Sequence, residues 1–284
     1  VGDVVLLDIY EGFAKGKALD MSQGGQVLNY DGRVTGTKDY ADIADSDVVV
    51  VTSGFPRQPG MTREDLIGKN ADIVSQVGEG IRQHAPNSIV VMVTNPLDLM
   101  TYHMQKVTGF EHSRVVGQAG ILDSARMTHF IAQAVGCSNE DVQAMVLGGH
   151  GDTMVPLPRY TTVNGIPVSQ LLSDEEVEAI CKRTASGGGE IVKLLEKGSA
   201  FYAPGSAAAI MAEAILDDRK RVLPCSTYLS GEYGMDDIYI GVPVVLGRNG
   251  VERIIELELA DDELDSLQGS GSFYKEQLSE ILGY

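Results

Sequence analysis

A histidine flanked by glycines is the strongest candidate for acid–base chemistry in this sequence. His150 lies in residues 148–152, which read Gly-Gly-His-Gly-Asp. Glycines on both sides let the backbone approach a ligand and leave the imidazole unobstructed. Histidine exchanges a proton near neutral pH, so His150 could act as a general acid or base, although a loop histidine without a role has the same local sequence. No such setting surrounds the other histidines, His84, His103, His112 and His129.

A carboxylate and a guanidinium form the second candidate. Asp123 and Arg126 are three residues apart in the helix-like stretch 121–135, and this spacing places both on one helix face. Taken alone, such a pair is typical of a surface ion pair that contributes little. Together with His150 it suggests a division of labour. Asp123 would orient the imidazole and stabilise its protonated form, and Arg126 would bind a carboxylate through two hydrogen bonds.

One loop carries two further cations. Residues 54–63 read Gly-Phe-Pro-Arg-Gln-Pro-Gly-Met-Thr-Arg and include Arg57 and Arg63. Composition alone favours a solvated surface loop. The alternative is a lid that closes on an anion and brings both guanidinium groups to it. Thr62 followed by Asp65 resembles a capping sequence at the start of a helix.

Short apolar runs must position these residues. Four runs are unbroken and rich in valine: 4–7, 48–51, 89–93 and 115–116. Such runs are typical of parallel strands that are covered on both faces. Helical stretches lie between them at 12–22, 62–84 and 97–107. The alternation predicts an α/β fold with a doubly wound parallel sheet, in which ligands bind at the carboxyl ends of the strands.

An acidic residue closes the first of these runs. Asp8 follows residues 4–7 directly. In a dinucleotide fold, an acid at this place can accept hydrogen bonds from both adenosine ribose hydroxyls and would repel the 2′-phosphate of NADP. An ordinary capping aspartate explains the residue equally well. Two later strands end in Val-Thr-Ser-Gly (51–54) and Val-Thr-Asn-Pro (93–96).

The pattern changes near residue 119. Helices are expected at 121–135, 205–217 and 261–283, and strands at 142–147 and 238–259. The run Gly187-Gly188-Gly189 predicts a kink or a break in a helix. We therefore expect a dinucleotide-binding domain over residues 1–119 and an α+β catalytic domain over residues 120–284.

One unit of a dinucleotide fold does not occur in this sequence. Such folds open with a strand, a GxGxxG turn and a helix, whereas here the first strand is the one that ends in Asp8. The pair Gly24-Gly25 and the run Gly187–Gly189 lack the required spacing. We expect the opening unit to belong to an N-terminal stretch that precedes residue 1.

Composition excludes several classes of function. The net charge of −18 would repel nucleic acids and anionic membranes, and no apolar run reaches the roughly 18 residues of a membrane-spanning helix. Three cysteines lie far apart, and no CxxC or HExxH spacing indicates a metal site. This cysteine usage fits a reducing, cytoplasmic compartment. We expect no metal, nucleic-acid or membrane partner.

Together these motifs resemble the lactate/malate dehydrogenase superfamily, and most closely its malate dehydrogenases of the lactate-dehydrogenase-like type. The resemblance covers essentially the whole chain and rests on residues 7–8, 17–20, 54–63, 93–98, 120–126 and 148–152. It implies an NAD-dependent enzyme that transfers a hydride reversibly between malate and oxaloacetate. It also implies a homodimer or homotetramer, for which the helices at 12–22 and 205–217 are candidate interfaces.

The resemblance further implies roles for single residues. His150 would donate a proton during ketone reduction, with Asp123 as its partner. Arg126 would bind the C1 carboxylate of the substrate, and Arg63 would polarise the reacting carbonyl. Asn95 would contact the substrate oxygen beside the nicotinamide. The residues expected to contact NAD are Asp8, Asn70, Val93, Thr94 and Asn95.

Arg57 would set the choice of substrate. Lactate dehydrogenases typically have an uncharged residue at this loop position, where pyruvate presents a methyl group. Oxaloacetate presents a second carboxylate, which is costly to bury without a cationic partner. Two alternatives stay open: a lactate dehydrogenase in which Arg57 is incidental, and a non-catalytic scaffold with the same fold. A sugar hydrolase on a related fold would need a metal site that we do not find in the sequence.

Overall fold

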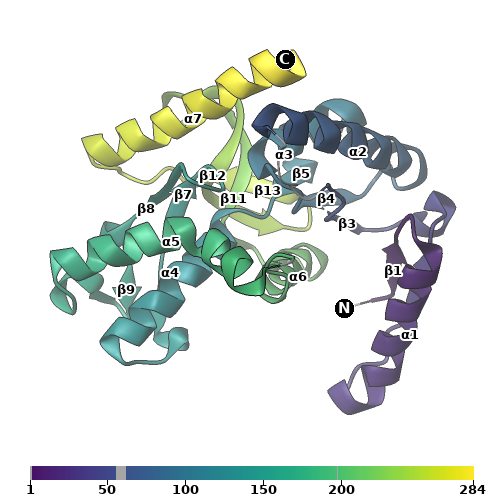
Figure 1. The fold of residues 1–284 in the computed structure, drawn as a ribbon, viewed down its shortest axis with the longest axis horizontal. Coiled ribbons are helices and arrows are strands. Elements are labelled where there is room, and N and C mark those ends of the chain that lie inside the picture. Colours follow the sequence, from purple (N-terminus) through teal and green to yellow (C-terminus); the bar gives the residue numbers. More distant parts are fainter. Residues whose placement is uncertain (1, 56–61, 197) are drawn as a thin grey trace.

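The structure is a computed structural model that describes residues 2–55, 62–196 and 198–284 (Figure 1). Its helices are α1 (Glu11–Leu28), α2 (Arg63–His84), α3 (Leu97–Thr108), α4 (Gly120–Val135), α5 (Asp174–Leu195), α6 (Tyr202–Leu216) and α7 (Asp261–Leu282). Its strands are β1 (Val4–Leu7), β2 (Val34–Thr37), β3 (Val48–Val51), β4 (Ile89–Met92), β5 (Val115–Gly117), β6 (Val142–Gln143), β7 (Val146–Gly148), β8 (Met154–Pro156), β9 (Thr162–Val163), β10 (Ile166–Pro167), β11 (Arg221–Ser230), β12 (Asp236–Gly247) and β13 (Gly250–Ile254).

The valine-rich runs form the parallel strands that the sequence predicts. β3, β4 and β5 are parallel neighbours, and β1 pairs in parallel with β2 in a separate small sheet. Val90, Val91 and Met92 of β4 are completely buried, as expected for a strand covered on both faces. Each such side chain contributes roughly 1.5–3 kcal/mol on burial. The predicted α/β class is confirmed.

The second half of the chain extends the same sheet. The strand order of the large sheet is β3-β4-β5-β11-β12-β7-β8, and β13 pairs with β12. The two halves join where β5 meets β11, with Ser226 opposite Gly117. Since β12, β7 and β8 are antiparallel neighbours, the far side of the sheet is antiparallel. The sheet therefore places β7, which leads into His150, in the same layer as the parallel strands.

Helices cover both faces of this sheet (Figure 1). α2, α3 and α7 pack on one face, α4 and α6 pack on the other, and α5 packs against α4. A second apolar cluster, which includes Met127, Ile131, Val163 and Ile180, joins α4 and α5 to the small sheet of β6, β9 and β10. α4 is thus held from several sides, and the side chains near its N-terminus have a fixed place relative to the sheet.

The glycine run in α5 does not interrupt that helix. α5 continues without a break from Asp174 to Leu195, so the predicted kink or break at Gly187–Gly189 is wrong. Its N-terminus has a capping box, in which Ser173 and Glu176 bond to each other's backbone N–H groups. Each glycine costs a helix about 1 kcal/mol relative to alanine. Packing of α5 against α4 offsets this local preference.

Candidate active site

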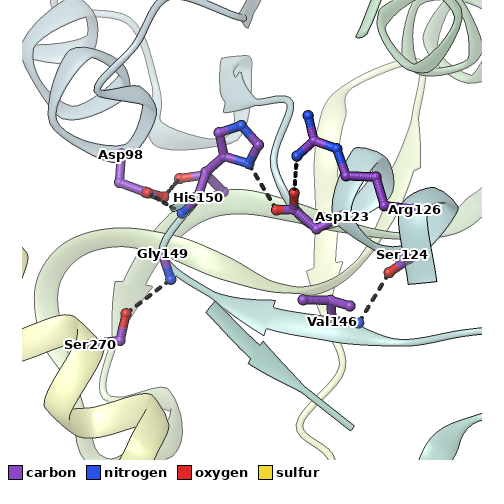
Figure 2. Close-up of polar contacts among 9 residues, drawn as sticks. Asp98, Asp123, Ser124, Arg126, Val146, Gly149, His150 and Ser270 are labelled. Carbon is purple, nitrogen blue, oxygen red and sulfur yellow. Dashed lines mark hydrogen bonds and ion pairs between the residues drawn. The ribbon is translucent and has the colours of Figure 1, made fainter. Parts of the chain in front are cut away.

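The loop that carries His150 is held by side chains from three helices. His150 lies two residues beyond the end of β7, and its backbone N–H donates to Asp98 Oδ2 of α3 over 2.8 Å. The N–H of Gly149 donates to Ser270 Oγ of α7 over 3.0 Å. The N–H of Val146 donates to Ser124 Oγ of α4, also over 3.0 Å (Figure 2). These three bonds fix the backbone of the loop and of β7, independently of any contact that the imidazole of His150 makes.

A close contact with α7 requires glycine at position 149. A Cβ atom built at Gly149 would lie 1.9 Å from Cε2 of Tyr274. That distance is far below any carbon–carbon contact, and the atom it would meet belongs to a buried ring. Gly148 has a φ of 83°, in the region that favours glycine. The glycines beside His150 thus seat this loop against α7.

The imidazole of His150 is held by Asp123. His150 Nδ1 lies 2.8 Å from Asp123 Oδ2, and the two side chains are 13% and 2% exposed. A carboxylate only accepts hydrogen bonds, so this contact places the Nδ1 proton between them. The other ring nitrogen, Nε2, points away from Asp123 (Figure 2). This is the arrangement of a histidine that is oriented at one nitrogen and free to exchange a proton at the other.

Two opposing effects set the proton affinity of His150. Burial lowers the pKa of the imidazole, because it disfavours the charged form. The charge of Asp123, its hydrogen bond and the more distant charge of Asp98 raise the pKa. These attractive contributions prevail, and the pKa of His150 lies above its ordinary value of 6.5. His150 can therefore carry a proton near neutral pH.

Arg126 completes this cluster. Its Nη1 donates to Asp123 Oδ1 over 2.9 Å, while its side chain is only 14% exposed. Among the described residues, no acceptor bonds to its Nε. A buried donor without an acceptor is costly, and a guanidinium is the side chain best suited to bind a carboxylate through two hydrogen bonds. The predicted trio of His150, Asp123 and Arg126 thus comes together in space.

A cavity of about 320 Å³ lies on the other side of Arg126, between α4, α5 and α6. Arg126 lines this cavity, whereas His150 does not. Its lining is mainly apolar and comprises Leu122, Ala125, Arg126, His129, Phe130, Gly187, Glu190, Ile191, Leu194 and Ala203.

The residues predicted around the end of β4 also lie together. Asn70 of α2 is buried; its Oδ1 accepts from the N–H of Phe55 over 2.6 Å, and its Nδ2 donates to the Asn95 carbonyl over 2.7 Å. Thr94 Oγ1 donates to the carbonyl of Ser53 over 2.7 Å. Val93 follows β4 and Asn95 is exposed beyond it. These bonds join the start of the loop at 54–63 to the end of β4.

The structure describes Asp8, but neither Arg57 nor the side chain of Arg63. Asp8 follows β1, is half-buried and accepts from the N–H of Tyr10 over 2.8 Å, which matches the capping alternative and leaves its second oxygen for other partners. Arg57 lies outside the described residues. Arg63 begins α2, and its side chain also lies outside the described part of the structure. Their contacts with NAD and substrate stay predictions.

Asp98 is the residue that the sequence patterns do not reveal. It is buried, and it accepts from Ser226 Oγ over 2.7 Å as well as from the backbone of His150. Burial raises the pKa of Asp98 to about 6, against the two hydrogen bonds that lower it. The available signal was an acid in the first turn of a helix, a few residues after the end of β4 and among apolar neighbours.

Comparison with known proteins identifies the family. A model of the NAD-binding domain of lactate/malate dehydrogenases matches residues 1–117, and a model of their alpha/beta C-terminal domain matches residues 121–283. The chain belongs to the lactate/malate dehydrogenase family. This confirms the family that the motifs predict, and it confirms NAD as the cofactor.

Individual relatives match nearly the whole chain. The malate dehydrogenase of Roseiflexus sp. (strain RS-1) is 58% identical over 264 residues, which are 93% of this chain and 85% of that protein. The solved malate dehydrogenase of Salinibacter ruber is 49% identical with a TM-score of 0.95, over 99% of this chain and 90% of that one. A lactate dehydrogenase of Cryptosporidium parvum, solved with lactic acid and NAD, is 44% identical with a TM-score of 0.94, over 99% and 90%. Overall shape therefore does not separate the two activities within the family.

The described residues lack the features of a membrane-spanning helix and of a metal site. Within 2–55, 62–196 and 198–284, no helix is both long enough and apolar enough to cross a membrane. Over the same ranges, histidine, cysteine and acidic side chains do not gather in groups of three that could hold a metal ion.

Proposed function

We propose that this protein is an NAD-dependent malate dehydrogenase that interconverts malate and oxaloacetate, with His150 as the general acid and base. The observation that carries the proposal is the contact of His150 Nδ1 with Asp123 Oδ2, beside a guanidinium that has an unused donor. A proton-exchanging group and a carboxylate-binding group in one buried cluster suit a 2-oxo acid. Relatives at 52–58% identity that are named malate dehydrogenase support the same activity.

The chemistry in the direction of reduction follows from these positions. When bound, the reduced nicotinamide supplies a hydride to the carbonyl carbon of oxaloacetate. His150 donates its Nε2 proton to the carbonyl oxygen, where negative charge develops as the C=O π bond breaks. Asp123 stabilises the imidazolium before transfer and holds the neutral ring afterwards. Arg126 binds the carboxylate next to the carbonyl. In the direction of oxidation, neutral His150 takes the hydroxyl proton of malate.

NAD fits the donors and acceptors at the strand ends. Asp8, at the end of β1, offers a half-exposed carboxylate, which suits the two hydroxyls of an adenosine ribose and disfavours a 2′-phosphate. Asn95 is exposed after β4 and would lie beside the nicotinamide and the substrate oxygen. Thr94 and Asn70 are buried, and their side chains hydrogen-bond to this edge, while the N–H of Val93 donates to the carbonyl of Val51.

The choice of oxaloacetate over pyruvate is assigned to Arg57, with Arg63 polarising the reacting carbonyl. Both belong to the loop at 54–63, whose start is tied to the end of β4 through Asn70. The support is electrostatic. The net charge of −18 repels a dianion, so its second carboxylate needs a local cation. Lactate dehydrogenase is the second candidate, favoured by the likeness to solved lactate dehydrogenases.

The decisive assay compares NADH oxidation with oxaloacetate and with pyruvate at the same enzyme concentration. We expect kcat/KM for oxaloacetate to exceed that for pyruvate by at least about 30-fold, the equivalent of about 2 kcal/mol. A preference for pyruvate would assign the protein as a lactate dehydrogenase. Calorimetric NAD binding without turnover of either acid would assign a non-catalytic scaffold.

We also propose that the chain forms a homodimer or homotetramer through α1, with α6 as a further candidate. The support is an apolar surface on α1, where Phe13, Leu19 and Met21 are 59%, 61% and 45% exposed. Light scattering should give a mass of two or four chains, and Leu19→Asp should lower it. A monomer at micromolar concentration would refute the proposal.

Two smaller proposals concern organisation and location. The chain divides near residue 119 into a dinucleotide-binding part and a catalytic part, which is supported by the start of α4 at Gly120. The protein works in a reducing, cytoplasmic compartment without nucleic-acid or membrane partners. Free thiols at Cys137, Cys181 and Cys225 and the charge of −18 support this.

A further inference from the structure

Helix α5 brings two glycines against Arg126. A Cβ atom built at Gly187 would lie 3.3 Å from Arg126 Cδ, which is tighter than most real contacts. At Gly188 it would lie 3.5 Å from Nη2 and 3.8 Å from Cζ of the same arginine. At Gly189 it would meet nothing within 4 Å. Two of the three consecutive glycines therefore border the guanidinium and its stem, and the third does not.

The glycines are not there for the helix itself. The three residues lie within the continuous helix α5, more than a turn before its end at Leu195. Their φ angles do not lie in the left-handed region that glycine is needed for. Apart from proline, glycine is the residue that helices disfavour most. The three glycines thus lower the intrinsic helix propensity of α5. What they provide in return is space beside the helix, which Arg126 occupies.

Arg126 is confined from two directions. On one side its Nη1 is bonded to Asp123, and on the other its stem and Nη2 lie against Gly187 and Gly188. Its Nε has no acceptor among the described residues. α5 therefore limits the positions that the stem and Nη2 of Arg126 can take on this side. A methyl group at position 187 would require the stem of Arg126, which carries the guanidinium, to shift by a few tenths of an ångström.

We propose that Gly187 and Gly188 are positioning residues that set the place of the Arg126 guanidinium for binding the substrate carboxylate. The proposal rests on the proposed function, in which Arg126 binds that carboxylate. Both glycines act through Arg126 and not on the substrate. The effect is graded. At Gly187 the added atom would be closer than ordinary contact, at 3.3 Å; at Gly188 it would only touch the guanidinium, at 3.5 Å; and at Gly189 it would meet nothing.

The test is a series of alanine variants at the three positions. Alanine favours a helix more than glycine does, so each change strengthens α5 locally, and a defect cannot be attributed to a weakened helix. With saturating NADH, we expect Gly187→Ala to raise KM for oxaloacetate at least tenfold, with a smaller change in kcat. Gly188→Ala should raise KM by less, and the matched control Gly189→Ala should change it less than twofold. The affinity for NADH, followed by its fluorescence, should be unchanged in all three.

A second measurement separates positioning from simple packing. In an Arg126→Ala background, Gly187→Ala should cause no further rise in KM, because the group that it displaces is gone. A similar rise in both backgrounds, or equal KM values for the three single variants and the wild type, would overturn the proposal. The series also separates the two proposals. An unchanged KM for oxaloacetate in Arg126→Ala would refute the proposed function. A raised KM in Arg126→Ala together with an unchanged KM in Gly187→Ala would refute only the role of the glycines.

Discussion

Asp98 accepts the backbone N–H of His150 at 2.8 Å, from the side of the residue opposite to its ring contact. The ring itself bonds to Asp123, so two buried carboxylates form hydrogen bonds with one histidine. Asp98 fixes the backbone and contributes negative charge, whereas Asp123 orients the imidazole directly. The division explains why the pKa of His150 is raised although burial opposes its charged form.

The pH dependence of the two reaction directions should be opposite. Reduction of oxaloacetate needs protonated His150, whose pKa is above 6.5, so kcat/KM for reduction should fall as pH rises through that pKa. Oxidation of malate needs the neutral ring and should fall as pH drops below it. Steady-state profiles from pH 5 to 10 in both directions measure this. If kcat/KM changed with pH in the same direction for reduction and oxidation, a group other than His150 would control the reaction.

Replacing Asp98 with asparagine should shift that profile. The change removes a charge that raises the pKa of His150 but retains an oxygen that can accept its N–H. The pH at which reduction falls should therefore move to lower values. Asp265→Asn, at an exposed position on α7, is the matched control and should leave the profile unchanged. An equal or higher kinetic pKa in Asp98→Asn would contradict this role.

The linked effect on stability has a defined sign. The folded-state pKa of Asp98 is raised from 3.8 to about 6, so ionisation is harder in the folded chain. The protonated carboxyl therefore favours folding below pH 3.8, and this contribution is lost as pH rises through about 6. Urea midpoints of the wild type should decline over this window relative to those of Asp98→Asn. The same pH dependence of the urea midpoint in the wild type and in Asp98→Asn would contradict the raised pKa.

Asp123→Asn should lower kcat for reduction by about 10²- to 10⁴-fold, the usual contribution of a positioned acid–base group. The amide cannot stabilise the imidazolium, and it can donate to Nδ1 and so favour the wrong tautomer. Arg126 also loses its carboxylate partner, so KM for oxaloacetate should change as well. Single-turnover kinetics and a thermal melt separate chemistry from folding. The control is Glu140→Gln, an exposed acid beyond the far end of α4, and equal rates in the two variants would refute the assignment.

Arg57→Gln should weaken oxaloacetate reduction by roughly 2–5 kcal/mol, the range for truncating one partner of a buried charge pair. Reduction of pyruvate should be unchanged or better, since a methyl group needs no cation. The measurement is kcat/KM for both acids, with Arg253→Gln on β13 as an exposed control. Full oxaloacetate activity in Arg57→Gln would remove the basis for the malate assignment.

Asn70→Ala should destabilise the fold by about 1–3 kcal/mol, because it leaves the Phe55 N–H and the Asn95 carbonyl without their partner. Since those groups lie beside the predicted nicotinamide position, KM for NADH should rise too. Urea unfolding and initial rates measure the two effects. The exposed Asn87→Ala serves as the comparison, and identical stability of both variants would contradict the bridging role.

The sequence predicts the regular elements better than their assembly. The helix expected at 62–84 is observed at Arg63–His84, because its period and its Thr62–Asp65 capping box are local signals. β2 escapes prediction because Val-Thr-Gly-Thr is short and contains glycine, and β11 because Pro224 lies within it. Neither has the pattern of a strand taken alone.

The site divides in the same way. Asp123 and Arg126 are predicted from helical spacing, and His150 from its glycines. The role of Asp98 depends on contacts with residues 52 and 128 positions away, which the presence of an acid in a first helical turn does not reveal. Gly187 and Gly188 suggest a broken helix because their local preference is clear, whereas the arginine that they face belongs to another helix.

Hydrogen bonds from Asp98, Ser124 and Ser270 make the position of the His150 loop and of β7 depend on three helices at once. The three bonds join residues 22, 121 and 52 positions apart, and closing such loops is entropically costly. Displacement of any one of these helices should therefore disturb the catalytic histidine. A rate assay reports the joining of both halves of the molecule, while a chain with most of its helices and strands in place can still be inert.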